Sequence, residues 1–219
     1  EAMGRRVCMV SDVLARPTAC CARHMPNCRL QPGLPGNTPQ ADERLAQELR
    51  DDRTALGSTP GSLEPWLLLR SLRTLHLRIR QQCTTASKLA KWLSRAVDGD
   101  HSHPLVGKVV SVSHPSLPSH PGHEVAVRQM VGGFGGCFSL ELASEDAARR
   151  LPAELELFRD ATSLGGVESL IEWRRKYDVA VSPLLLRVSV GVEEEEHLRA
   201  DLERGILRTT AACLSKEGE

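Results

Sequence analysis

Residues 160–191 read DATSLGGVESLIEWRRKYDVAVSPLLLRVSVG and combine a glycine-bearing turn with a long apolar run. The turn occupies residues 163–166, and the apolar run occupies residues 184–190, between a proline and a glycine. An apolar run of this length, bounded in this way, predicts a buried strand. A single charged residue, Arg187, lies inside the run.

Arg187 needs an anionic partner, because a guanidinium is costly to bury alone. One interpretation is an internal ion pair, for instance with Glu168 or Glu141. The other is a binding site for a ligand carboxylate, because the planar guanidinium donates two parallel hydrogen bonds to two carboxylate oxygens. Residue type alone favours the ion pair.

Four stretches resemble, in the same order, the Cys/Met-metabolism enzymes that use pyridoxal phosphate. This family contains cystathionine gamma-synthases, cystathionine lyases and related sulfhydrylases. The resemblance extends from about Arg53 to about Ile206. The stretches are PGSLEPWLLLRSLRTLHLRIR (60–80), VSHPSLPSHPGHEVAVRQMVGGFGGCFSLEL (112–142), SLGGVESLIE (163–172) and LLLRVSVGVEEEEHLRADL (184–202).

The resemblance implies a fold and a chemistry. The fold would be the small C-terminal domain of the aspartate-aminotransferase-like fold, an α/β domain with a mostly antiparallel sheet and helices packed on one side. The chemistry would be pyridoxal-phosphate-dependent transsulfuration, the making or breaking of carbon–sulfur bonds in small sulfur-containing amino acids. Family members form homo-oligomers, which makes a second copy of the chain an expected partner.

The resemblance also assigns site residues. Arg187 matches the arginine of the family motif R-x-S-x-G, which binds the substrate α-carboxylate. Ser163 opens the S-L-G-G motif at the substrate pocket, and together with Thr162 and Leu164 it would position the substrate and cofactor. Several family members carry glutamate at the position of Thr162, so the choice between lyase and synthase stays open.

The N-terminal region departs from the family. Residues 11–15, SDVLA, resemble a fragment that follows the cofactor-binding lysine by a few positions, but Arg5 stands at the equivalent position. Arginine stays protonated and does not form a Schiff base as lysine does. The first lysine of the chain is Lys88. The resemblance therefore implies pyridoxal phosphate as the cofactor, with its catalytic lysine and most of its binding residues missing here.

Composition divides the chain into three parts. Residues 1–52 are an irregular segment, residues 53–214 the substrate-binding domain, and residues 215–219 a tail. Four of the seven cysteines crowd into the first part without the paired spacing of a zinc site, so no metal site is expected. The odd number of cysteines favours a reduced, cytoplasmic protein.

Charge and hydropathy exclude two classes of partner. The chain has 28 basic and 28 acidic residues, which gives no electrostatic reason to expect nucleic acid. No apolar stretch has the length of a membrane span.

Periodicity predicts eight elements, in the order helix, helix, strand, helix, strand, helix, strand, helix. The first helix starts after Ser62, with a buried stripe formed by Leu68, Leu72, Leu75 and Ile79. The second helix has a stripe formed by Ala86, Leu89, Ala90 and Leu93. The remaining elements are a strand at 106–112, a short helix at 121–130, a strand at 137–142, a helix at 145–157 interrupted near Pro152, a strand at 184–190 and a helix at 193–207 with Leu198, Leu202 and Ile206 buried.

Two further functions compete with the enzyme. One is a non-catalytic fragment that only associates with full-length family subunits, which the missing lysine favours. The other is a general binding module that uses Arg187 to hold small carboxylates.

Overall fold

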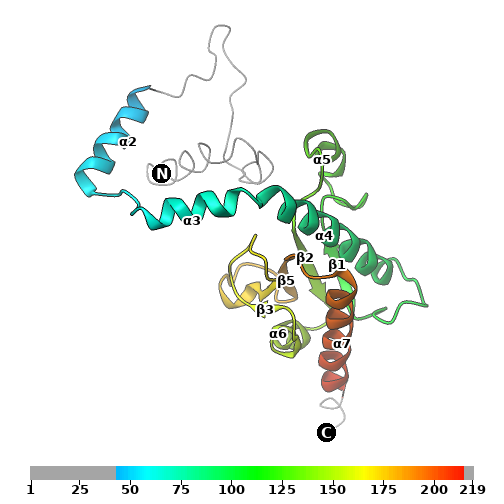
Figure 1. Ribbon diagram of the computed structural model, residues 1–219. Helices are drawn as coiled ribbons and strands as arrows, with labels where there is room; N and C mark the ends of the chain where they lie inside the picture. The colour runs from blue at the N-terminus through cyan, green and yellow to red at the C-terminus, as the bar shows by residue number, and fades with distance from the viewer. Residues whose placement is uncertain (1–42, 215–219) are drawn as a thin grey trace. The chain divides into compact units, whose positions relative to one another are not determined.

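The structure, a computed structural model, describes residues 43–214, and the side chains of residues 47–211 (Figure 1). The chain divides into two compact units between Arg73 and Thr74. The described elements are α2 (Glu43–Leu56), α3 (Leu63–Leu72), α4 (Leu75–Val97), β1 (Val109–Ser113), α5 (His123–Gln129), β2 (Cys137–Leu142), α6 (Glu145–Glu154), β3 (Arg159–Asp160), β4 (Leu170–Trp173), η2 (Arg174–Lys176, a 3₁₀ turn), β5 (Leu185–Ser189) and α7 (Glu195–Leu214). The predicted division at residues 52 and 214 stays a prediction.

The second unit contains a five-stranded sheet in the order β1-β2-β5-β4-β3. The first three neighbouring pairs are antiparallel, and only β3 and β4 run parallel. The expectation of a mostly antiparallel sheet is therefore confirmed. The predicted strand at 137–142 has the same bounds in the structure, and the strand predicted at 184–190 is β5.

Two strands were missed by the sequence analysis. β3 has two residues and β4 has four, LIEW, with a glutamate in the middle. Short segments with an internal charge do not give the apolar alternation from which strands are predicted. The structure supplies the reason for the charge, because Glu172 of β4 lies directly opposite Arg187 of β5.

The core lies on one face of the sheet, where α4, α6 and α7 pack (Figure 1). Successive side chains of a strand point to opposite faces, so alternate residues of β2, β5 and β4 enter this core. The strand residues that do so are Phe138, Leu140, Leu142, Leu186, Val188 and Ile171. The predicted stripes of the second and last helices are confirmed, because each of their residues has no exposed surface.

The helix boundary near residue 74 differs from the prediction. The chain interrupts the helix at Arg73–Thr74, so Leu75 and Ile79 belong to α4, together with the stripe predicted for the second helix. Leu68 and Leu72 of α3 are 44% and 38% exposed, and α3 buries none of its residues. Leu75 and Ile79 are half-buried, so the buried stripe predicted for the first helix is wrong. Periodicity identifies an apolar face, but it does not say what covers that face.

The other helices differ from the prediction mainly at their ends. α6 ends at Glu154, with Pro152 in its last turn, and α7 continues from Glu195 to Leu214. The Ser144 hydroxyl accepts a hydrogen bond from the Ala147 N–H and caps α6. Of the helices in residues 43–214, none is both long and apolar enough to cross a membrane.

Candidate functional site

The candidate site lies on the face of the sheet opposite the core. Ser139 of β2, Arg187 of β5 and Glu172 of β4 occupy matching positions on three neighbouring strands. Since they alternate with the core residues, their side chains lie on the second face. We call these three residues the polar row.

The Arg187 side chain is held on two sides. Its Nε lies 2.9 Å from Oε1 of Glu172. Its Nη2 donates to the carbonyl oxygens of Thr162 and of Ser163, the latter at 2.9 Å. These contacts fix the guanidinium with respect to both the sheet and the turn before β4.

Glu172 is the ion-pair partner of Arg187, which corrects the expected partners Glu168 and Glu141. Glu168 is exposed, and the Glu141 carboxylate accepts a hydrogen bond from Ser111 at 2.9 Å. Glu172 is fully buried, and its Oε1 also lies 2.8 Å from Nη1 of Arg174. Two arginines therefore contact one buried carboxylate; Glu172, Arg174 and Arg187, which we call the triad, together carry one excess positive charge.

The guanidinium of Arg187 keeps one nitrogen for a ligand. Among the described residues, Nη1 has no partner, Nη2 donates to two carbonyl groups, and the buried Nε lies within ion-pair distance of Glu172 without making a hydrogen bond. The side chain is 24% exposed, so solvent or a small anion can reach it. An arginine in a fixed orientation with an unused N–H pair is suited to binding a carboxylate.

The turn that carries the S-L-G-G motif is anchored by three hydrogen bonds, to α4, to β5 and to the segment that follows β5. The Gly165 N–H donates to the Ser189 hydroxyl at 3.2 Å, and Nε2 of Gln82 on α4 donates to the Gly166 carbonyl at 2.5 Å. The Val192 N–H donates to the Val167 carbonyl at 2.9 Å. Gly165 has a φ of 75°, a backbone conformation that non-glycine residues rarely adopt. Glycine adopts this conformation at little cost, so it favours the turn at this position.

The segment that follows β5 approaches the same turn closely. A Cβ on Gly191 would lie 2.2 Å from the Val167 carbonyl oxygen, so only glycine fits here. Glu193 accepts hydrogen bonds from the N–H and the hydroxyl of Ser169, each at 2.8 Å. Glu193, the first of four consecutive glutamates (193–196), therefore holds the turn in place.

Thr162, Ser163 and Leu164 all lie on the exposed part of this turn. Thr162 and Ser163 reach Arg187 through their carbonyl groups, and Leu164 is 54% exposed. The structure thus brings the first two beside Arg187, whereas their roles toward a substrate stay predictions. Arg5 lies outside the described residues.

Sequence reasoning did not identify Glu172, Arg174 or Gln82 as parts of the site. Glu172 belongs to the quoted motif SLIE, but only strand pairing places it beside Arg187. Arg174 follows two residues later in the basic run RRK (174–176), and nothing in that run indicates a contact with Glu172. Gln82 lies 84 positions from its partner, Gly166, so local sequence patterns cannot predict this contact.

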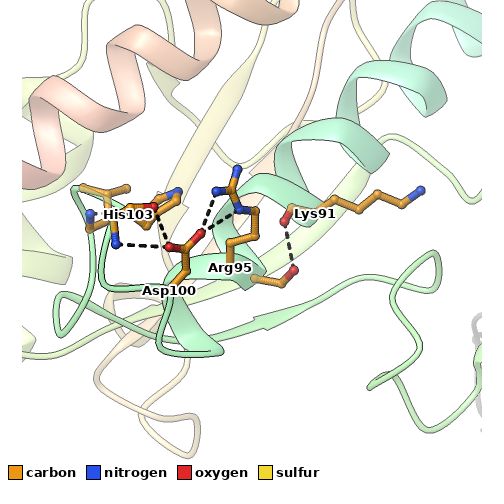
Figure 2. Close-up of polar contacts among 7 residues, drawn as sticks. Lys91, Arg95, Asp100 and His103 are labelled. Carbon is orange, nitrogen blue, oxygen red and sulfur yellow. Dashed lines mark hydrogen bonds and ion pairs between the residues drawn. The ribbon is translucent and has the colours of Figure 1, made fainter.

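A second polar cluster closes the end of α4 (Figure 2). Asp100 accepts two hydrogen bonds from Arg95, at 3.0 and 2.6 Å, and two from Ser102, at 3.1 and 2.6 Å. The Ser102 hydroxyl, followed by Arg95, lowers the pKa of Asp100 to about 2. In the same loop the Leu105 N–H donates to Nδ1 of His103, whose pKa burial lowers. The cluster ties the last turn of α4 to the following loop, because Asp100 accepts from the Arg95 side chain and its own N–H donates to the Arg95 carbonyl at 3.1 Å.

The histidines of the proline-rich loop are bound by that loop and its neighbours. Nδ1 of His114 lies 2.7 Å from the Ser116 hydroxyl, and its Nε2 lies 3.3 Å from the Gly135 carbonyl. Nδ1 of His123 lies 2.8 Å from the Pro115 carbonyl. Nowhere in the described part of the chain are three His, Cys, Asp or Glu residues grouped to hold a metal ion.

Comparison with known proteins gives concordant matches. The family described as "Cys/Met metabolism PLP-dependent enzyme" matches residues 34–207. Cystathionine gamma-synthase from Escherichia coli K12 is 41% identical over 176 residues, which are 75% of this chain and 43% of that protein. Cystathionine beta-lyase from Coxiella burnetii is 34% identical over 177 residues, again 75% of this chain and 43% of that protein. The chain thus spans less than half the length of these relatives.

Solved structures show the same partial correspondence. The metB protein of Corynebacterium glutamicum matches with a TM-score of 0.67 and 35% identity, covering 76% of this chain and 43% of that one. Cystathionine gamma-lyase from yeast matches with a TM-score of 0.67 and 30% identity, covering 77% and 44%. Both matches support the α/β fold expected from the sequence.

Proposed function

The chain belongs to the family of Cys/Met-metabolism enzymes that depend on pyridoxal phosphate, and from this premise we propose that it carries the substrate-binding part of a transsulfuration enzyme. Its substrate would be a small sulfur-containing amino acid, in which a carbon–sulfur bond is made or broken. Both synthases and lyases occur among the relatives, so the direction of the reaction stays open. A cytoplasmic location and assembly with further copies of the chain belong to the same proposal.

The observation that carries the proposal is the state of Arg187. Its guanidinium is oriented by Glu172 and by the carbonyls before β4, and it keeps Nη1 without a partner among the described residues. A substrate α-carboxylate would bind there as a charge-assisted hydrogen-bond acceptor. The exposed turn of Thr162, Ser163 and Leu164 would border the bound amino acid and position it.

The described residues fit the substrate and not the cofactor. Pyridoxal phosphate supplies an electron sink when bound, and a lysine amine binds it covalently. The described lysines are Lys88, Lys91, Lys108 and Lys176. Lys88 pairs with Glu195 and Lys176 with Asp160, and none of the four makes an ion pair with Glu172. The chemistry would therefore need groups that the described residues do not supply.

We accordingly expect the purified 219-residue chain to have no turnover of its own. It would be incubated with pyridoxal phosphate and L-cystathionine, dialysed, and assayed for retained cofactor absorbance and for ketoacid. Weak binding at exposed lysines such as Lys88 should be lost on dialysis. Retained cofactor together with ketoacid production would contradict this part of the proposal.

Substrate binding is tested with Arg187→Lys, which keeps the charge but loses the planar guanidinium and its free Nη1 donor. Calorimetric titration with L-cystathionine should show affinity falling by about 1.5–3 kcal/mol, the value of a hydrogen bond to a charged group. The control is Lys176→Gln, which removes a nearby charge outside the triad. If Arg187→Lys and the unchanged chain bind L-cystathionine with equal affinity, Arg187 does not bind the substrate.

The alternative, a non-catalytic subunit that associates with full-length relatives, is favoured by α3. This helix buries none of its residues and exposes Leu63, Trp66 and Leu69 by 59–62%. An exposed apolar surface of this kind is typical of a binding interface. Size-exclusion chromatography of the chain mixed with the Escherichia coli cystathionine gamma-synthase tests it, and co-elution would support this alternative.

A further inference from the structure

Two arginines share one carboxylate oxygen at the edge of the candidate site. Nη1 of Arg174 lies 2.8 Å, and Nε of Arg187 2.9 Å, from the same Oε1 of Glu172. The two guanidiniums are therefore close neighbours. A single arginine paired with Glu172 would have no net charge, whereas the second arginine restores a positive charge to the site.

Arg174 has more unused donors than Arg187. Within the described part of the chain its only partner is Glu172, so Nε and Nη2 are unoccupied. The Arg174 side chain is 31% exposed and the Arg187 side chain 24% exposed. Both cations thus present N–H groups to a small anionic ligand while the same buried carboxylate holds them.

The backbone around Arg174 is fixed as well. Nε1 of the preceding Trp173 donates to the Pro183 carbonyl at 2.7 Å. The carbonyl of Arg174 accepts from the N–H groups of Tyr177 and Asp178, at 3.0 and 3.1 Å. The arginine is therefore held at the start of the η2 turn, where it reaches Glu172.

The other cations of this basic run have different partners. Arg175 donates to the carbonyls of Val179 and Val181, and Lys176 pairs with Asp160 at 3.7 Å. Of Arg174, Arg175 and Lys176, only Arg174 contacts Glu172. The run is thus not a uniform basic surface, and one of its members belongs to the site.

We infer that Arg174 is a second anion-binding residue of the site, so that the site takes a small amino acid with two carboxylates. One carboxylate binds Arg187 and the other binds Arg174, and Glu172 keeps the two guanidiniums side by side. This inference rests on the proposed function, because it takes Arg187 as the group that binds the first carboxylate. It makes Arg174 a residue that determines specificity.

The test compares L-glutamate with L-glutamine, which have the same shape and differ in the charge of the distal group. The full chain is titrated with each by calorimetry at low ionic strength. We expect it to bind L-glutamate about threefold to fivefold more tightly, as a solvent-accessible ion pair permits. Arg174→Gln should abolish this preference, and Arg174→Lys should retain most of it. Lys176→Gln, which removes the same charge two residues away, should leave the preference unchanged.

The outcomes separate the inference from the proposed function. If Arg187→Gln weakens the binding of both amino acids while Arg174→Gln leaves their ratio unchanged, the inference is wrong and the carboxylate site stands. Two other outcomes would show that Arg187 does not bind a carboxylate, and the inference would then fail with the proposed function. In the first, Arg187→Gln binds both amino acids as tightly as the unchanged chain. In the second, the unchanged chain binds neither amino acid at about 50 mM, a concentration at which even a weak single ion-pair contact is detected. Thermal unfolding of each variant shows that the fold is retained.

Discussion

Arg187 fulfils one of the roles considered for it and leaves room for the other. It forms an internal ion pair, as residue type favours, but with Glu172 instead of the glutamates named from the sequence. Its Nη1, which has no partner within residues 43–214, stays free for the proposed ligand. The ion pair and the carboxylate site are therefore compatible, because a guanidinium has five N–H donors and Glu172 contacts only its Nε.

The buried carboxylate of Glu172 makes it the residue of the site most sensitive to truncation. Glu172→Ala would leave two arginines without their anion, although both can partly reach water. We expect the free energy of unfolding to fall by about 1–3 kcal/mol, below the full value for a deeply buried pair. Urea unfolding measures this change. Glu168→Ala, at an exposed position nearby, should change it by less than about 0.5 kcal/mol, and equal losses for both variants would contradict the assignment.

His114 should make stability depend on pH. Burial lowers its pKa from the ordinary 6.5, and Nδ1 accepts the Ser116 N–H at 3.3 Å, a contact that protonation of Nδ1 removes. The unfolded chain therefore binds the proton first as the pH falls, so stability should decrease below about pH 6.5. Urea midpoints between pH 8 and 5 test this. His114→Asn should reduce the dependence of the urea midpoint on pH without abolishing it, since burial lowers the pKa of His103 too. An unchanged dependence would show that His114 is not its source.

At the scale of elements, Asp201 connects α7 to the chain that leaves α6. Its carboxylate is 1% exposed and accepts the backbone N–H groups of Glu156, Leu157 and Phe158, at 2.8–3.4 Å. Nη2 of Arg204 lies 2.6 Å from it and compensates its charge. This single side chain therefore fixes where the segment after α6 turns toward β3.

Removing this connection should destabilise the whole second unit. Asp201→Ala leaves three backbone donors without an acceptor, and we expect a loss of about 2–4 kcal/mol in the free energy of unfolding. Arg208→Ala, at an exposed position on the same helix, is the matched control and should change it by less than about 0.5 kcal/mol. Chemical denaturation followed by circular dichroism measures both. A loss below about 1 kcal/mol for Asp201→Ala would mean that water replaces the carboxylate.

For the whole molecule, the apolar surface of α3 predicts association. Trp66 and Leu69 are 59% and 60% exposed on this helix, and large exposed apolar groups favour association. We expect the average mass from light scattering to rise with concentration, and Trp66→Glu combined with Leu69→Glu to suppress the rise. Lys91→Glu makes the same change in net charge on α4 and should not suppress it. A concentration-independent monomer mass for the unchanged chain would contradict the prediction.

The sequence by itself determined the class of fold, the bounds of β2, and the buried stripes of α4 and α7. The bounds of β2 and the helix stripes follow from local periodicity, which the amphipathic elements keep wherever they pack, whereas the class of fold followed from the resemblance of the motifs to a known family. It also singled out Arg187, the residue around which we describe the candidate site. Its motifs placed the chain in a family before any contact was known.

Only the tertiary structure decided the partner of Arg187, the existence of β3 and β4, and the exposure of Leu68 and Leu72. Glu172 meets Arg187 through strand pairing, and Gln82 meets Gly166 across 84 residues of sequence. Such contacts depend on register and topology, which short-range patterns do not encode. An apolar stripe has the same periodicity whether or not something covers it, so burial is a property of the folded chain and not of the stripe.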